Sequence, residues 1–110
     1  MLLDVRTYVC KPGTIKAQFT LYEAKGKGPQ TRHLGQPIVY AAGETGNPNE
    51  YLHIWVYENA GDRERRRAAM QADPEWQAYL KESNALGALE SQGTRLMTAV
   101  DFFAQPTNGE

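Results

Sequence analysis

The sequence is poor in the residues that build disulfide networks, metal centres and membrane spans. Its single cysteine, Cys10, excludes an internal disulfide, and because no activating partner is evident we interpret its thiol as inert. The two histidines and this cysteine lack the spacing of a zinc site, so we expect neither a metal nor a cofactor. No apolar run approaches the length that crosses a bilayer, and no membrane association is predicted.

An excess of charge of one sign is also absent. The chain of 110 residues has 12 basic and 13 acidic side chains and a net charge of −1, which predicts no binding of nucleic acid or anionic membranes. The dense cluster DRERRR, residues 62–67, is interpreted as a solvated helix face, with a phosphate-binding patch as the alternative. Because Asp4 and Arg6 interrupt the apolar start of the chain, we expect a strand there and a cytoplasmic protein.

Hydrophobic periodicity predicts one domain over residues 1–103 and a polar, disordered tail at 104–110. The predicted elements are a strand at 2–10, a helix at 14–25, a long polar loop with the sequence KGKGPQTRHLGQP at 25–37, strands at 37–45 and 50–58, a helix at 62–72, a second helix at 73–87 and a strand at 94–103. Asp62 and Asp73 are the expected N-caps of the last two helices, and Pro74 suits a first helical position.

This order of elements is typical of the ferredoxin-like βαββαβ arrangement, an α+β fold with a four-stranded antiparallel sheet and its helices on one face. The strand EYLHIWVYE is apolar on both of its faces, and its alternating sets are Tyr51, His53, Trp55 and Tyr57 against Leu52, Ile54 and Val56. We therefore predict a two-fold homodimer whose sheets pack face to face into a barrel, with a modestly apolar monomer as the alternative. The alternation leaves open which set faces the helices.

Several segments resemble the NIPSNAP family. They are DVRTYVCKPGTIKAQFTLYE near the start, RHLGQPI, LHIWVYEN, and DRERRRAAMQADPEWQAYL, in which an arginine run precedes DPEW. The resemblance extends over residues 3–103 and implies a dimeric α+β barrel. The wider barrel superfamily includes cofactor-independent oxygenases of aromatic substrates, heme-degrading enzymes and small-molecule isomerases, although a shared fold by itself transfers no activity.

Rings with a hydrogen-bonding tip, together with cations, suit an aromatic or carbonyl ligand held between the sheet and the helices. The predicted ligand-binding set is Arg6, Tyr8, Arg32, His33, Tyr40, His53, Trp55 and Tyr57. Within it, Arg32, His33 and His53 are the candidate catalytic groups, as acid, base or anion stabiliser. A hydrogen-bonded core position is the competing interpretation for His53, and an ion pair with Asp4, Glu44 or Asp101 is the competing one for Arg6.

The leading hypothesis for function is a small homodimer that binds an apolar or aromatic small molecule. In its enzymatic form this is a cofactor-independent oxygenase or an isomerase. The alternative is a non-catalytic protein–protein interaction module that acts through its dimer surface or through the arginine-rich helix. No nucleophile elbow, phosphate loop or paired-acid motif points to a particular reaction.

Overall fold

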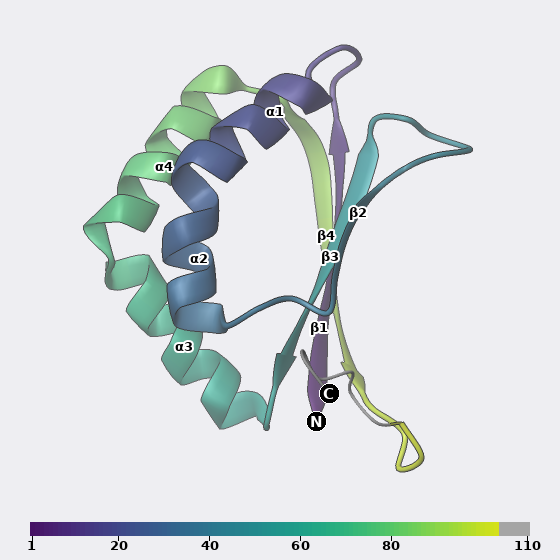
Figure 1. Ribbon diagram of the computed structural model, residues 1–110, viewed down its shortest axis with the longest axis vertical. Helices are drawn as coiled ribbons and strands as arrows, with labels where there is room; N and C mark the ends of the chain where they lie inside the picture. Colours follow the sequence, from purple (N-terminus) through teal and green to yellow (C-terminus); the bar gives the residue numbers. More distant parts are fainter. Residues whose placement is uncertain (104–110) are drawn as a thin grey trace.

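Four strands form one antiparallel sheet, and every helix within residues 1–103 lies against the same face of it (Figure 1). The computed structural model describes residues 1–103, so the predicted tail at 104–110 lies outside the described residues. The elements in chain order are β1 (Leu2–Cys10), α1 (Ile15–Leu21), the π-helix η1 (Tyr22–Gly26), α2 (Lys27–Leu34), β2 (Val39–Ala42), β3 (Glu50–Tyr57), α3 (Ala60–Ala72), α4 (Pro74–Leu86) and β4 (Leu89–Thr98). The strand order β2-β3-β1-β4 confirms the predicted ferredoxin-like fold.

The register of the sheet brings three of the predicted ligand-binding residues side by side. Arg6 on β1 pairs with His53 on β3, and His53 pairs on its other side with Tyr40 on β2. Directly opposite residues in a sheet point to the same face, so these three side chains form one row across the sheet. The neighbouring β1–β3 pair, Tyr8 with Tyr51, lies two residues along on that same face.

The structure decides which side of β3 meets the helices. Tyr51, His53, Trp55 and Tyr57 are all buried, whereas the residues between them are only partly covered. Trp55 and Tyr57 pack in the main core with Leu34, Met70, Trp76 and Tyr79 from the helices. Trp76 is thus a core residue. The set that contains His53 therefore faces the helices.

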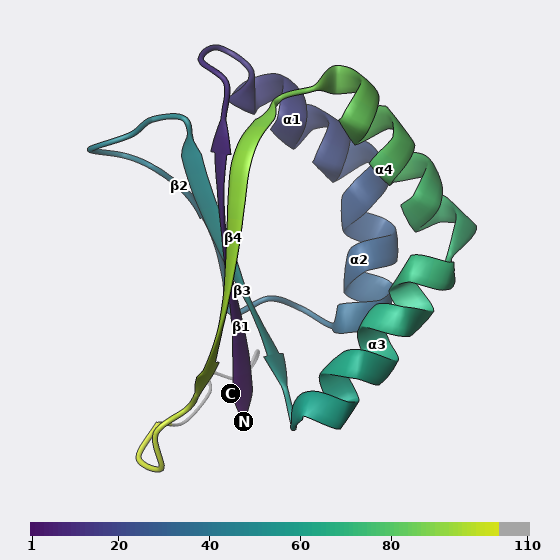
Figure 2. The same ribbon diagram turned by 180° about the vertical axis from the view of Figure 1, so that it is seen from behind.

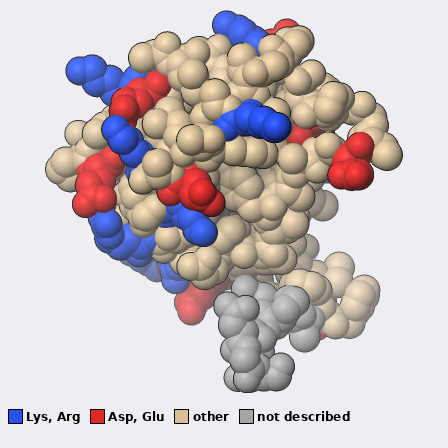
Figure 3. Space-filling view, turned by 45° about the horizontal axis from the view of Figure 1, so that its top comes forward, with Lys and Arg blue, Asp and Glu red and all other residues tan. Residues whose placement is uncertain are grey.

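The opposite face of the sheet carries no helix among residues 1–103 (Figure 2). It presents partly exposed aliphatic side chains from three strands: Leu3, Val5, Val9, Val39, Leu52, Ile54 and Val56. Charged side chains of both signs gather instead over the helices, on the left of Figure 3, while the side of the sheet is mostly uncharged. This contrast leaves one broad apolar surface on the isolated chain.

The prediction of a long loop at residues 25–37 is wrong, because the chain there remains helical through η1 and α2 to Leu34. Gly26 is not a helix terminator. A Cβ at this position would lie 2.8 Å from Cδ1 of Tyr22 and 2.9 Å from Cε1 of Tyr79, so glycine is required by close packing. The π-helix η1, with its i→i+5 hydrogen bonds, ends at Gly26, and a new α-helix, α2, begins at Lys27. Pro29 therefore lies in the first turn of α2, where the missing N–H of proline is tolerated.

Other boundaries also differ from the prediction. β2 is shorter than expected, and β4 covers Leu89–Thr98 rather than 94–103, because its polar first half pairs with β1 as an edge strand. Asn59, not Asp62, caps α3: its side chain accepts a hydrogen bond from the Asp62 N–H at 2.8 Å. The predicted cap of α4 is confirmed, since Asp73 accepts the Glu75 N–H at 2.8 Å and Pro74 follows it.

Candidate functional site

A cavity of about 220 Å³ lies between the sheet and the helices. The sheet contributes side chains from all four strands, and the helical segments contribute polar and aromatic side chains from α1, η1, α2, α3 and α4. The lining residues that matter below are Arg6, Tyr8, Tyr40 and His53 from the sheet, and Gln18, Arg67, Trp76 and Tyr79 from the helices. The right-handed crossovers place the helices over this face, and the register given above brings the sheet residues together.

His53 is held on three sides. Its ring stacks between Tyr40, at a centroid distance of 4.7 Å, and Tyr8, at 5.1 Å. Its Nδ1 accepts a hydrogen bond from the indole Nε1–H of Trp55. An imidazole that accepts at Nδ1 carries its proton on Nε2, and this N–H donates to no residue in the described part of the chain. With both faces and Nδ1 occupied, the ring edge at Nε2 is the part of His53 left for a ligand.

The His53 ring is neutral at physiological pH. Burial lowers its pKa to about 3, and the positive charge of Arg6 lowers it in the same direction. A neutral imidazole whose acceptor nitrogen is already used cannot take a proton at neutral pH. His53 is therefore suited to donate one hydrogen bond, for example to a developing oxyanion, and not to act as a general base.

Arg6 is fixed by two neighbours on its own strand. Its Nε donates to the hydroxyl of Tyr8 at 3.0 Å, and its guanidinium lies 3.5 Å from Oδ1 of Asp4. Asp4 is completely buried, and its other oxygen accepts from Nε of Arg63 on α3 at 3.0 Å. Of the three partners considered for Arg6, the structure has Asp4, while Arg6 also remains part of the cavity wall.

Several buried tyrosines around the cavity are neutral, and two of them form hydrogen bonds with glutamine side chains. Burial raises the pKa of Tyr22, Tyr40 and Tyr51 well above its usual range. The hydroxyl of Tyr79 accepts from Nε2 of Gln18 at 3.0 Å, and that of Tyr22 donates to Gln30 at 2.6 Å. Such groups supply hydrogen bonds without adding negative charge to the site.

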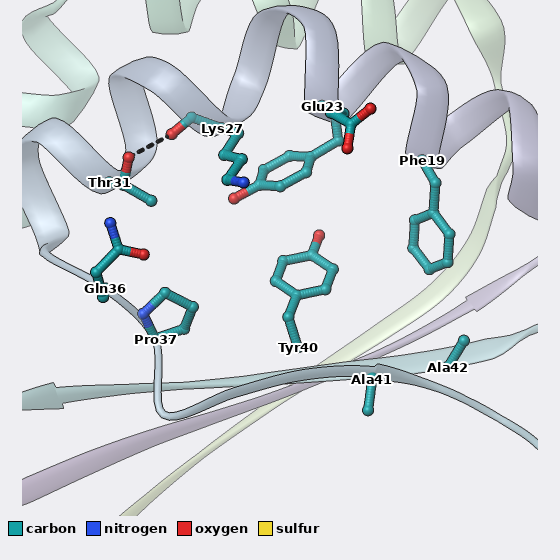
Figure 4. Close-up of a pocket in the computed structure, with 10 residues that line it drawn as sticks. Phe19, Glu23, Lys27, Thr31, Gln36, Pro37, Tyr40, Ala41 and Ala42 are labelled. Atoms are coloured by element: carbon teal, nitrogen blue, oxygen red, sulfur yellow. Dashed lines mark hydrogen bonds between the residues drawn. The ribbon is translucent and has the colours of Figure 1, made fainter. Parts of the chain in front are cut away.

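A second hollow of about 450 Å³ opens at the β2 edge of the sheet (Figure 4). Phe19, Lys27 and Thr31 from the helices face Pro37 and Tyr40 across it, and Tyr22 is also part of its lining. Tyr22 and Tyr40 stack at a centroid distance of 5.0 Å, and both also line the inner cavity. This aromatic pair thus forms the wall between the outer hollow and the inner cavity.

The structure divides the predicted ligand-binding residues into three groups. Arg6, Tyr8, Tyr40 and His53 line the inner cavity. Trp55 and Tyr57 do not line it: they are buried core residues at 0% and 1% exposure, and Trp55 acts on the site through His53. Arg32 and His33 form the third group, which lies elsewhere.

Arg32 and His33 sit on α2, not on a loop, and their side chains bind the start of α4. Nη1 of Arg32 and Nε2 of His33 each lie 2.8 Å from Oδ2 of Asp73, and Arg32 also reaches Glu75 at 3.2 Å. The hydrogen bond from His33, followed by that from the Glu75 N–H, lowers the pKa of Asp73. These two residues therefore join two helices and do not line the inner cavity.

Residues that the sequence did not single out also reach the cavity, chiefly Arg67 and Gln18. The interpretation of DRERRR as a solvated face is correct for Glu64 and Arg65, which are exposed. It is wrong for Arg63 and Arg67, which turn toward the sheet. The signal was available: Arg63 and Arg67 precede the buried Met70 by seven and three residues, the spacing of one helix face. Sequence reasoning missed this spacing, because charged residues such as arginine are mostly exposed and are therefore not counted as part of a buried helix face.

Residues 1–103 contain neither a metal-binding cluster nor a membrane-spanning helix. No group of three or more His, Cys, Asp or Glu side chains in this part of the chain is placed to hold a metal ion. No helix in it is long and apolar enough to span a membrane. Cys10 is buried, and burial raises the pKa of its thiol.

The arrangement was then compared with known proteins. The family model described as NIPSNAP matches residues 3–104. The chain belongs to the NIPSNAP family. A NIPSNAP family protein of unknown function from Agrobacterium tumefaciens is similar to it, with 34% identity, a TM-score of 0.86, and coverage of 96% of this chain and 94% of that one. An uncharacterized NIPSNAP domain protein from Burkholderia xenovorans has 25% identity and a TM-score of 0.87, with 94% and 99% covered.

More distant structures share the fold of this NIPSNAP chain. A putative antibiotic biosynthesis monooxygenase from Nitrosomonas europaea has 11% identity and a TM-score of 0.64, and the match covers 91% of this chain and 99% of that one. At that identity the likeness concerns the ferredoxin-like fold alone. No curated protein matches the chain.

Proposed function

We propose that this NIPSNAP protein is a homodimer that binds a small planar molecule in the cavity between its sheet and helices. The observation that supports it most is the environment of His53, whose faces and Nδ1 are occupied and whose Nε2–H is left without an acceptor among the described residues. A donor held this firmly beside a cavity is suited to one acceptor atom of a ligand.

The dimensions of the cavity favour a small ligand. A volume of about 220 Å³ is below the range of about 300–1,000 Å³ that is usual for drug-sized ligands, so a single-ring molecule fits the space better. Trp76 and Tyr79 supply aromatic surface, and the tyrosine hydroxyls and Gln18 supply hydrogen bonds. The outer hollow beside Tyr22 and Tyr40 offers an approach from solvent if that pair moves apart.

In its enzymatic form the proposal is a cofactor-independent oxygenase or isomerase acting on a substrate that binds as its oxyanion, having lost its proton to solvent. His53 would donate a hydrogen bond to this oxyanion, and Arg6 would stabilise its charge. Within the described residues no Asp or Glu lines the inner cavity, so proton abstraction by a carboxylate is not part of the proposal.

Binding is tested on the protein as purified, by native mass spectrometry for a retained ligand and by thermal shift with a panel of single-ring compounds. We expect at least one compound to raise Tm. His53→Gln should weaken that ligand by about tenfold, whereas His33→Gln should leave its affinity unchanged, because His33 binds Asp73 outside the cavity. If no ligand is retained and no compound raises Tm, or if both variants bind alike, the proposal is refuted. Oxygen uptake with each binding compound tests the oxygenase form.

The homodimer is proposed through the open face of the sheet. The aliphatic side chains on that face are only partly covered and no helix of residues 1–103 packs on them, and a second copy would cover them. Ile54 lies near the middle of this face, between Val5 and Val39. We expect sedimentation to give twice the chain mass and Ile54→Arg to give a monomer. A wild-type monomer at micromolar concentration would contradict the dimer.

A further inference from the structure

The charges around the inner cavity do not balance. Two arginines line it, Arg6 from β1 and Arg67 from α3. Among residues 1–103, no aspartate or glutamate contributes to its wall. The site is therefore electropositive, although the whole chain has a net charge of −1.

The nearest acid, Asp4, offsets only part of this charge. One of its oxygens accepts from Arg63 at 3.0 Å, and the other lies 3.5 Å from Arg6, so a single carboxylate serves two guanidinium groups. Arg67 forms no ion pair with any described residue, unlike Arg63, Arg65 and Arg66 on the same helix. The three cations Arg6, Arg63 and Arg67 together with the one anion Asp4 leave an excess of two positive charges beside the cavity.

These cations are only partly solvated. The Arg6 side chain is 15% exposed, and Arg67 is half-buried. A buried charge that lacks a partner is costly, and an anion placed between two arginines recovers that cost through charge-assisted hydrogen bonds. The remaining groups on the wall agree with an anion, since His53 presents an N–H and the tyrosines are neutral phenols.

We propose that the ligand of this cavity is an aromatic carboxylate whose acid group binds between Arg6 and Arg67. This inference rests on the proposed small-molecule function and specifies the chemical class of the ligand. The planar guanidinium matches a carboxylate through two parallel hydrogen bonds, and a single-ring acid suits the volume. His53 donates to a second polar atom on the ring, and Trp76 and Tyr79 enclose the ring from the helix side.

The test compares acids with their uncharged amides by calorimetry at pH 7 and constant ionic strength. The probes are benzoate with benzamide, and 4-hydroxybenzoate with 4-hydroxybenzamide. We expect each acid to bind about tenfold or more tightly than its amide. Arg67→Gln should reduce the affinity for the acid to that for the amide. Arg65→Gln is the matched control: this side chain is 72% exposed on the same helix, and its variant should bind like the wild type.

The outcomes separate this inference from the function on which it rests. Equal affinity for acid and amide would overturn the carboxylate assignment while the binding function stands, and absence of binding by all four probes would overturn the assignment and count against the function as well. Inorganic phosphate that binds more tightly than either acid would also overturn it. Arg67→Lys keeps the positive charge but removes the two parallel N–H donors of the guanidinium. An affinity for the acid between those of the wild type and Arg67→Gln supports the carboxylate contact and excludes misfolding as the cause of the loss in Arg67→Gln.

Discussion

The indole N–H of Trp55 donates a hydrogen bond to Nδ1 of His53, two residues earlier on the same face of β3. This contact fixes the proton of the neutral imidazole on Nε2, at the ring edge beside the cavity. Core packing and the chemistry of the candidate site therefore meet in one pair of residues. The interpretation of His53 as a hydrogen-bonded core group is confirmed at Nδ1, and the proposed role in ligand binding concerns the other ring nitrogen, Nε2.

The protonation state of His53 can be measured directly. Because its pKa is lowered to about 3, we expect its ¹⁵N resonances to keep the pattern of the neutral Nε2–H tautomer as pH falls from 7 to about 4.5. An Nδ1–H tautomer for His53, or protonation near pH 6.5, would contradict the hydrogen bond from Trp55.

The same group makes stability depend on pH. The folded pKa of His53 lies below that of the unfolded chain, so the unfolded state binds the proton first as pH falls. The neutral ring of His53 therefore adds its full share to the free energy of unfolding above about pH 6.5. Between about pH 6.5 and pH 3 the free energy of unfolding falls, by about 1.4 kcal/mol per pH unit in the middle of that range. Denaturant titrations of wild type and His53→Gln should show this difference in slope between pH 6 and 4. Parallel curves would refute the expectation.

Gly26 and Gly28 form a matched pair on the continuous helix. Gly26→Ala should lower stability by about 1–3 kcal/mol, because the new methyl group would press on Tyr22 and Tyr79. A Cβ at Gly28 meets no atom within 4 Å outside its two chain neighbours, but Gly28 precedes Pro29, whose ring disfavours the helical conformation of a residue that carries a Cβ. Gly28→Ala should therefore change stability by less than about 1 kcal/mol, because this clash offsets the helix propensity of alanine. Thermal unfolding of both variants tests this difference in magnitude. If residues 25–37 were a loop, Gly26→Ala would not lower stability in this way.

Asp73 should matter for stability more than for binding. Asp73→Ala removes the cap of α4 and the partner of Arg32 and His33, whereas Asp73→Asn keeps the cap. We expect Tm to fall for both variants and further for the alanine. Because the folded pKa of this carboxyl is lowered, its stabilisation is present above the unfolded pKa and is lost as pH falls through the folded one. In both variants, Tm should therefore fall less steeply with decreasing pH than in the wild type. An unchanged ligand affinity in both variants would distinguish Asp73 from the cavity residues.

The elements that followed from local signals were predicted well. Alternation located β3, and Asp73 with Pro74 located the start of α4, because strand parity and helix capping depend on neighbouring residues. The loop error at residues 25–37 arose from glycine and proline, which usually end helices. Here Gly26 serves a contact with Tyr79, more than fifty residues away in the sequence, and no local pattern reports such a contact.

The candidate site was predictable only in part, for the same reason. The sequence identified Arg6, Tyr8, Tyr40 and His53 as polar or aromatic groups in apolar strands, and these four line the cavity. It misplaced Arg32 and His33, because it could not reveal that Asp73 lies within hydrogen-bond distance of α2. It also missed the inward turn of Arg67.

By itself, the sequence determined the βαββαβ order, the antiparallel sheet and the alternation that groups His53 with Tyr51, Trp55 and Tyr57, since periodicity and capping are properties of neighbouring residues. Only the tertiary structure decided that this set faces the helices, that His53 is wedged between Tyr8 and Tyr40, and that Arg67 joins Arg6 at one cavity. These facts depend on strand register and on how α3 and α4 pack over the sheet. Both are set by the burial of residues far apart in the chain, which the linear order of amino acids does not display.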